Sequence, residues 1–203
     1  MSELTIIIPA AGRSLRMQGQ DKLMMLVDGV ACLRRIAACA AALNGRVIIA
    51  LNHAFPDRAD ALSGLAVERL VIDRPQDGMS ASLRQALDQV AKDASGVMIV
   101  PADMPELDVT DLRMMQAAFQ ENPNNILQGA SQDGRPGHPV IFPQRLFADL
   151  MQIKGDRGAR AVLDAHLDEV ILVALPGQHA VVDLDTCAEW ANWNNARCGS
   201  DHQ

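Results

Sequence analysis

Short, uninterrupted apolar runs alternate with stretches of helical periodicity along the first half of the chain, and this alternation limits the fold more than any other feature. The runs at residues 46–51 and 97–100 are almost wholly apolar, as expected for strands buried on both faces. We predict strands near 4–9, 46–51, 67–73 and 96–101. Between them we predict helices near 30–44, 80–93 and 109–120, with a further short helix within 54–65. The alternation predicts an α/β fold with a mostly parallel central sheet and helices on both faces.

The second half of the chain departs from this rhythm. Residues 124–143 are typical of two strand pieces that flank a turn at 132–137. Further along we predict helices near 144–152, 157–167 and 186–196, and strand pieces near 169–175 and 181–184. These features favour one domain over residues 1–203, with a small β-rich insertion in its C-terminal part and a tail at 199–203.

The composition excludes several classes of protein. With 25 acidic and 18 basic side chains the net charge is −7, so the broad basic face of a nucleic-acid-binding protein is not expected. Aromatic residues make up 3% of the chain, which leaves no stacking platform for bases. No run approaches the ~18 apolar residues of a membrane helix, the chain starts without a basic signal-peptide region, and the cysteines lack metal-binding spacing. We expect a cytoplasmic protein that contacts neither nucleic acid nor membrane.

The loop that follows the first predicted strand concentrates positive charge on an acidic chain. Its first residues have a methyl group or no side chain, so that backbone N–H groups can approach an anion: Ala10, Ala11 and Gly12. Three cations follow: Arg13, Arg16 and Lys22. The spacing matches neither a Walker A loop nor the G-x-G-x-x-G fingerprint. We predict that this loop binds phosphate, with a surface loop of solvated cations as the alternative.

Three aspartates are candidates for a metal site. Asp103 follows a buried strand and lies close to two prolines, where a carboxylate can bind a hard cation such as Mg²⁺ together with substrate phosphates. Asp183 and Asp185 are two residues apart in a predicted strand piece and would point to the same side. Capping is the alternative, since Asp103 could cap the turn before the next helix and Asp185 or Thr186 could cap the last helix.

Residues 78–82 have the composition of a ligand-binding helix start. The free N–H groups and the dipole of such a helix favour a polar or negative ligand group near Gly78, Ser80 and Ser82. An ordinary N-cap role for Ser80 is the alternative.

Two glycine-rich segments of the second half carry charged side chains. His138 lies between a glycine and a proline, and Arg135 and Arg160 could reach the same cleft. This combination suggests recognition of an anionic second substrate. The structural alternatives are a packed histidine and a helix-capping role for Asp156.

Taken in order, these segments resemble the molybdenum cofactor nucleotidyltransferases, and in particular their cytidylyltransferase branch. The first segment, Pro9-Ala10-Ala11-Gly12-x-Ser14-x-Arg16-Met17, is similar to the loop of the wider superfamily. The narrower resemblance rests on Gly137-His138-Pro139-Val140 and Gly155-Asp156-x-Gly158-Ala159-Arg160. The remaining matching segments are Asp21-Lys22-Leu23, Gly78-Met79-x-x-Ser82-Leu83, Ala102-Asp103-Met104-Pro105 and Asp183-Leu184-Asp185-Thr186. The resemblance covers nearly the whole chain and implies a Rossmann-like nucleotidyltransferase fold.

The resemblance also implies an activity: Mg²⁺-dependent transfer of a cytidylyl group from CTP to the terminal phosphate of molybdopterin or molybdenum cofactor, with release of pyrophosphate. It implies a nucleotide-binding half at residues 1–105 and an acceptor-binding half at 106–198. The implied catalytic residues are Arg16, Lys22 and Asp103. The implied nucleotide-binding residues are Ala10, Ala11, Gly12, Arg13, Arg16, Lys22, Gly78, Ser80, Ser82 and Ala102. The acceptor side would use His138, Asp156 and Arg160, and the metal would be bound by Asp103 with Asp183 or Asp185.

Other functions are compatible with the same residues. The guanylyltransferases of this cofactor tend to have Ala-Gly-Gly where this chain has Ala10-Ala11-Gly12, which favours CTP over GTP. Transfer to a different small phosphate is a second alternative. A third is a non-catalytic protein that binds the cofactor and delivers it. Transient contact with a recipient molybdoenzyme or its chaperone is expected. The chain departs from the family at Ala102, where glycine is common, and at Gln18-Gly19-Gln20, without losing a chemical group.

Overall fold

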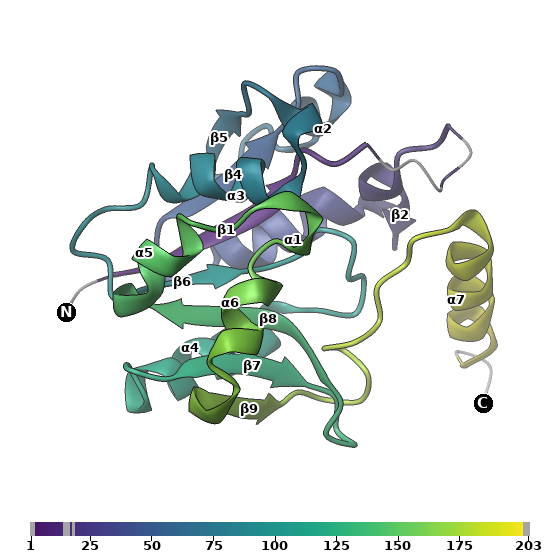
Figure 1. Cartoon of the computed structure of the whole chain (residues 1–203). Helices are drawn as coiled ribbons and strands as arrows, with labels where there is room; N and C mark the ends of the chain where they lie inside the picture. Colours follow the sequence, from purple (N-terminus) through teal and green to yellow (C-terminus); the bar gives the residue numbers. More distant parts are fainter. Residues whose placement is uncertain (1–2, 14–16, 18, 201–203) are drawn as a thin grey trace.

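One sheet of seven strands forms the centre of the molecule (Figure 1). The computed structural model describes residues 3–13, 17 and 19–200, except for the side chains of Asp156 and residues 198–200. The strands are β1 (Leu4–Ala10), β4 (Val47–Leu51), β5 (Glu68–Val71), β6 (Gly96–Ile99), β7 (Ile126–Ala130), β8 (Pro136–Pro143) and β9 (Val170–Ala174). Their order across the sheet is β5-β4-β1-β6-β8-β7-β9.

The sheet is mostly parallel, as the sequence predicts. Strand β8 pairs antiparallel with both of its neighbours, β6 and β7, whereas the pairs β1–β4, β1–β6, β4–β5 and β7–β9 are parallel. The first residues of β8 therefore lie at the same edge as the carboxyl ends of the other strands. The two strand pieces predicted within 124–143 are β7 and β8, and they extend the central sheet.

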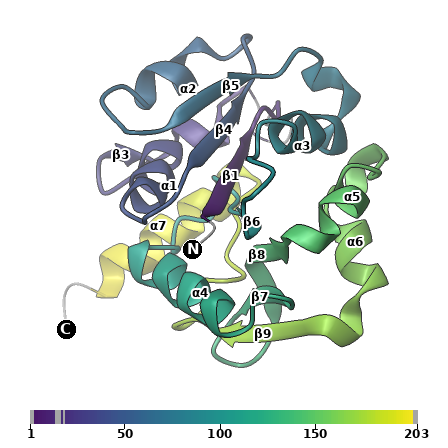
Figure 2. The same cartoon turned by 90° about the vertical axis from the view of Figure 1, so that its left-hand side faces the viewer.

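Helices cover both faces of this sheet (Figure 2). Helices α1 (Cys32–Ala41) and α4 (Val109–Glu121) pack on one face, and α3 (Met79–Leu87), α5 (Phe147–Leu150) and α6 (Arg160–Ala165) pack on the other. The chain also forms α2 (Pro56–Ala61) and α7 (Cys187–Ser200). The 3-10 turns are η1 (Lys22–Met24), η2 (Pro75–Asp77), η3 (Gln144–Leu146), η4 (Gly155–Arg157) and η5 (Leu167–Glu169). None of the helices in the described part of the chain is long and apolar enough to cross a bilayer.

The central strands feed two separate apolar cores. In β1, Ile6 and Ile8 join the core beneath α1 and α4, while Ile7 joins the core beneath α3, α5 and α6. Each fully buried isoleucine contributes about 1.5–3 kcal/mol relative to an exposed one. The two cores thus hold β1 and its neighbours β4 and β6 firmly, and the loops at their carboxyl ends start from fixed points.

Several predicted elements differ from those observed, and the helix predicted near 80–93 already ends at Leu87. The helix predicted near 30–44 begins only at Cys32, because Val30–Ala31 (β3) pairs with Leu26–Val27 (β2) in a small hairpin whose turn has positive φ at Asp28 and Gly29. The strand piece predicted near 181–184 is not a strand. These residues belong to a crossing segment, residues 175–186, that runs past the strand ends toward α7 (Figure 1).

The crossing segment is attached by backbone hydrogen bonds to three separate parts of the sheet edge. The Leu175 N–H donates to the Ala130 carbonyl at 2.8 Å, and the His138 N–H donates to the Ala180 carbonyl at 2.8 Å. The Leu184 N–H donates to the Asp103 carbonyl at 3.3 Å. The backbone partners of this segment are therefore not those of a strand ladder. The apolar residues of the segment do not show this in the sequence.

Gly137→Ala should destabilise the protein. A Cβ atom at position 137 would lie 1.9 Å from the Ala180 carbonyl oxygen and 2.9 Å from Val181 Cγ1, so the crossing segment would have to move. We expect a loss of about 1–3 kcal/mol in the free energy of unfolding, measured by urea denaturation. Gly12→Ala is the matched control, because nothing lies within 4 Å of its Cβ position. Equal stability of the two variants would contradict this packing.

Candidate active site

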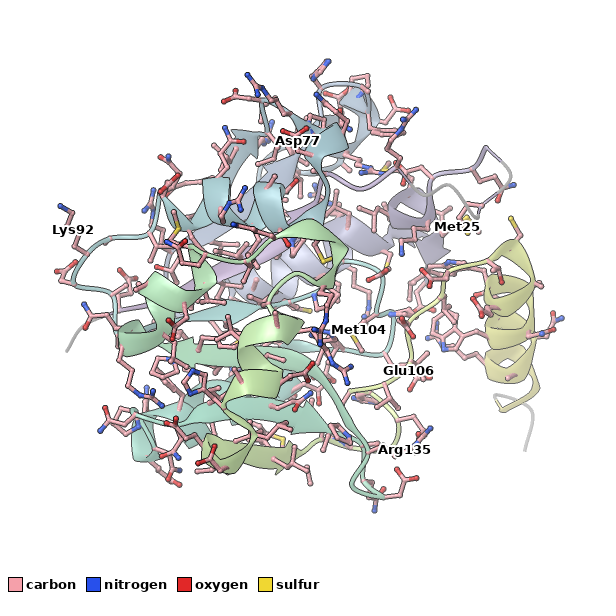
Figure 3. The ribbon with its side chains drawn as sticks, viewed as in Figure 1. Met25, Asp77, Lys92, Met104, Glu106 and Arg135 are labelled. Atoms are coloured by element: carbon pink, nitrogen blue, oxygen red, sulfur yellow. The ribbon has the colours of Figure 1, made fainter. Side chains whose placement is uncertain are left out.

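A cavity of about 490 Å³ opens at the carboxyl ends of β1 and β6, where open α/β sheets bind ligands. Residues from both halves of the chain line it, including Pro101 and Met104 after β6, Val140 in β8 and Val181 in the crossing segment. Met104 is labelled in Figure 3. Six of the residues predicted for the site line this one cavity: Lys22, Asp103, His138, Arg160, Asp183 and Asp185.

Lys22 is held between two carboxylates at this cavity. Its Nζ donates to Asp103 Oδ2 and, at 2.7 Å, to Asp185 Oδ1. The three side chains are between 16% and 22% exposed, so the cluster is partly desolvated yet open to a ligand. Burial lowers the pKa of Lys22, but the ion pairs with Asp103 and Asp185 outweigh burial and raise that pKa above its usual value. Lys22 is therefore a permanent cation at neutral pH.

A capped 3-10 turn fixes the position of the Lys22 backbone. It is the first residue of η1, whose N-cap is Asp21, and the Asp21 side chain accepts a hydrogen bond from the Leu23 N–H at 3.0 Å. The charge pattern of the sequence indicates Lys22, but it indicates no role for Asp21.

The capping alternative is wrong for Asp103 and Asp185, whereas the alternative that Thr186 caps the last helix is confirmed. The N-cap of α4 is Asp108, which accepts from the Thr110 and Asp111 N–H groups, so Asp103 is not needed there. At the start of α7, Thr186 Oγ1 accepts from the Glu189 N–H, and the Glu189 carboxylate accepts from the Thr186 N–H. This reciprocal cap leaves the Asp185 side chain directed toward Lys22.

The chemistry of the carboxylates fits a divalent cation. Burial raises the pKa of the Asp183 carboxyl, and the negative charges of Asp103 and Asp185 raise it further. A cation near these carboxylates would offset that repulsion, and carboxylate oxygens are the ligands that Mg²⁺ prefers. Asp103 with Asp183 or Asp185 would hold such an ion, and the ion would supply charge neutralisation to bound phosphates. Their ligand atoms do not form a compact triad within 4.8 Å in the described part of the chain.

A second group of possible ligands lies outside the cavity and has a structural explanation. The ligand atoms of Asp108, Asp111 and His179 lie within 4.8 Å of one another. Asp108 and Asp111 form the capping box of α4, and Asp111 Oδ2 also lies 2.9 Å from His179 Nδ1. The Asp111 side chain is fully buried and burial raises its pKa. The group therefore attaches the crossing segment to α4 through the hydrogen bond between Asp111 and His179.

On the acceptor side, the structure places His138 and Arg160 at the cavity wall, while the side chain of Asp156 lies outside the described residues. Arg160 is 73% exposed and lies 3.4 Å from Asp164, so this contact is weak. Arg157 lines the same wall and the sequence analysis missed it. It belongs to the glycine-rich segment that was already singled out, and charge alone could have indicated it.

His138 is neutral at physiological pH. Its ring is accessible from the cavity but surrounded by protein atoms, and this desolvation lowers its pKa below the usual value of 6.5. The carboxylates of Asp103 and Asp183 oppose the shift without reversing it, whereas Arg160 adds to it. A neutral imidazole can donate one hydrogen bond and accept another.

His138→Gln should reduce the loss of stability at acidic pH. Because the native pKa of His138 is lowered, the unfolded chain takes up this proton at a higher pH than the native protein does. The free energy of unfolding therefore falls as the pH drops from the unfolded-state pKa of about 6.5 toward the lower native pKa, below which the loss is complete. We expect a smaller difference between urea denaturation curves at about pH 7 and about pH 5 in the variant than in the parent protein. An identical difference would show that His138 titrates normally.

The predicted nucleotide-binding residues lie in several places. Ala10, Ala11 and Ala102 are buried, Gly12 and Arg13 are exposed, and Arg16 lies outside the described residues. Gly78 precedes α3 with φ +87°, and Ser82 Oγ donates to its carbonyl at 3.3 Å. Ser80 is 1% exposed and its Oγ has no hydrogen-bond partner among the described residues, so the N-cap alternative for Ser80 is wrong. Among the described residues, none of the eight positions named here other than Arg16 lines the cavity.

The fold is that of the nucleotidyltransferases. The whole chain superposes on a CMP-2-keto-3-deoxy-manno-octonic acid synthetase complexed with CTP, with a TM-score of 0.75, 12% identity and coverage of 98% of this chain and 100% of that one. A protein from Mycobacterium tuberculosis H37Rv is similar with a TM-score of 0.79, 25% identity and coverage of 96% and 98%. A manganese complex from the same organism has a TM-score of 0.73, 24% identity and coverage of 94% and 97%.

More narrowly, the chain belongs to the MobA-like NTP transferase domain family, whose model matches residues 6–170. It is 35% identical over 109 residues to a probable molybdenum cofactor guanylyltransferase of Natronomonas pharaonis, and the match spans 53% of either chain, about half the length of that relative. A molybdenum cofactor guanylyltransferase of Serratia proteamaculans is 26% identical over 96% of either chain. The predicted fold and transferase class are confirmed, whereas these relatives are named for GTP rather than CTP.

Proposed function

We propose that the protein transfers a nucleotidyl group from a nucleoside triphosphate to the terminal phosphate of molybdopterin or molybdenum cofactor. The observation that carries this proposal is the position of Lys22, a half-buried cation between Asp103 and Asp185 at the strand-end cavity. Membership of the MobA-like NTP transferase family and the names of the relatives support the substrate class.

In the proposed reaction an oxygen of the acceptor phosphate forms a bond to the α-phosphorus of the nucleotide. The bond from that phosphorus to the oxygen bridging to the β-phosphate breaks, and pyrophosphate leaves with the electron pair. The Lys22 ammonium and, we propose, Arg16 and the backbone of Ala10–Gly12 stabilise the charge that develops on the leaving group. A metal ion, proposed to be Mg²⁺, would be bound by Asp103 with Asp183 or Asp185.

The proposal divides the chain between the two substrates. We assign nucleotide binding to residues 1–105. The residues proposed to contact the nucleotide, besides Lys22, Arg16 and Ala10–Gly12, are Arg13, Gly78, Ser80, Ser82 and Ala102. We assign acceptor binding to residues 106–198, with Arg160 and Arg157 as cations for phosphate and His138 as a neutral hydrogen-bonding group. Asp156 is proposed for the same wall.

We propose GTP as the donor, because the relatives from N. pharaonis and S. proteamaculans are named guanylyltransferases. The sequence-based choice of CTP is not supported by those names. CTP is the second candidate because this chain has Ala10-Ala11-Gly12, and Ala11, whose side chain packs into the core beneath α3, stands where the guanylyltransferases tend to have glycine.

A pyrophosphate-release assay tests both proposals. The purified protein is mixed with molybdopterin, a divalent salt and either GTP or CTP, and the nucleotide-linked cofactor is identified by mass spectrometry. Release with GTP supports a guanylyltransferase, and release with CTP but not GTP supports the second candidate. Tight binding of cofactor without pyrophosphate release from any nucleotide would overturn the enzymatic proposal in favour of a delivery protein.

A further inference from the structure

One buried arginine contacts both ends of the loop that precedes Lys22. Arg58, in the short helix α2, is 0% exposed, and its guanidinium stacks on the Phe55 ring at 4.2 Å. Nη1 donates to the carbonyls of Ala10 at 2.6 Å and Gly12 at 2.7 Å. Nε and Nη2 donate to the two carboxylate oxygens of Asp21 at 2.7 and 2.8 Å. The sequence analysis did not identify Arg58, since an isolated arginine in a polar helix start gives no signal.

The contacts with Ala10 and Gly12 determine which way the loop peptides face. In a planar trans peptide the C=O and the following N–H point in opposite directions. Because Arg58 attracts the carbonyls of Ala10 and Gly12, the N–H groups of Ala11 and Arg13 are turned away from α2. Those N–H groups belong to the segment that the proposed function assigns to phosphate binding.

The contact with Asp21 fixes the other end of the loop. Asp21 is the N-cap of η1, and Lys22 is the first residue of that turn. A carboxylate held by both arms of a guanidinium cannot rotate freely, because the paired hydrogen bonds fix its plane. The position of the Lys22 backbone therefore depends on Arg58, although Arg58 does not line the cavity as described.

We infer that Arg58 is a positioning residue for nucleotide binding, which orients the loop peptides at one end and Lys22 at the other. The inference rests on the proposed function. Lysine cannot replace Arg58 in this role, because a single ammonium lacks the planar fork that reaches two carbonyls and both oxygens of one carboxylate.

Arg58→Lys tests the inference, with Arg46→Lys as the matched control. Arg46 also pairs with both oxygens of a carboxylate, that of Glu68, but at the surface. We expect Arg58→Lys to lower kcat/KM by about 100-fold and to raise the nucleotide KM. A purely structural role would reduce the folded fraction and the apparent kcat while leaving KM unchanged. Hydrogen exchange without nucleotide should become faster at residues 10–13 and 19–24 in Arg58→Lys but not in Arg46→Lys.

If Arg58→Lys does not fold, Asp21→Asn tests whether Arg58 positions the loop and Lys22. It keeps an oxygen for the Leu23 N–H and removes the charge that Arg58 holds, so KM should rise and exchange at residues 19–24 should accelerate. A folded Arg58→Lys or Asp21→Asn variant with unchanged KM and unchanged exchange would overturn the inference. If the parent protein turns over no nucleotide, the proposed function fails, and the exchange measurements alone decide the role of Arg58.

Discussion

Lys22→Ala should lower kcat while the protein stays folded. The expected loss of transition-state stabilisation is about 2–4 kcal/mol. The Lys22 ammonium is the cation that the structure places between Asp103 and Asp185 at the cavity. Without it, charge developing on the departing pyrophosphate loses a fixed positive partner, and the two carboxylates repel the incoming phosphates more strongly. Steady-state pyrophosphate release, with circular dichroism to confirm folding, measures the effect.

Lys92→Ala is the control for this variant. Lys92 is exposed and lies at the left edge of the molecule in Figure 3, away from Met104 near the centre of the view. The Lys92→Ala variant loses the same charge as Lys22→Ala without a change in the cavity. Its turnover should therefore equal that of the parent protein. Near-normal turnover of Lys22→Ala would mean that Lys22 only neutralises the aspartates and takes no part in the reaction.

Asp103→Asn should raise the metal concentration needed for half-maximal activity by at least about 10-fold, because a neutral amide is a poor ligand for a hard cation. It also removes the ion pair with Lys22, so kcat should fall even at saturating metal. Titration of activity with MgCl₂ and MnCl₂ measures both effects. Asp183→Asn and Asp185→Asn, titrated in parallel, identify the second carboxylate.

Asp93→Asn is the matched control for Asp103→Asn, because it also replaces one carboxylate by an amide. Asp93 is exposed and precedes β6, whereas Asp103 follows it, so the two residues lie at opposite ends of the same strand. Its metal titration should match that of the parent protein. If Asp103→Asn shows an unchanged metal requirement, Asp103 does not belong to a metal site and its role is confined to holding Lys22.

The sequence predicts most of the sheet because its strands are local, continuous apolar runs. Residues 46–51 and 96–101 contain β4 and β6, and the rule that ligands bind at carboxyl strand ends located Asp103. Lys22 was found through charge on an otherwise acidic chain. Spacing linked Asp185 to Asp103 as a possible metal ligand, whereas His138 was assigned to the same site as Lys22 only by resemblance.

Long-range hydrogen bonds explain what the sequence did not predict. Residues 181–184 alternate like a strand, but their partners are the backbone of Asp103 and neighbouring turns rather than a ladder. Arg58 acts through carbonyls whose direction no sequence pattern encodes. The hairpin before α1 is different, because its Asp28-Gly29 turn is a local signal for positive φ that the sequence contains.

The distance along the chain between Lys22 and Asp185 has a consequence for biosynthesis. The ion pair joins residues 163 positions apart, and Asp185 lies in the crossing segment just before α7. On the ribosome, the first half of the sheet can form while the aspartates that complete the cavity have not yet been made. We therefore expect a nascent chain to acquire its charge-balanced cavity only after Asp185 has emerged, later than the strands β1, β4, β5 and β6.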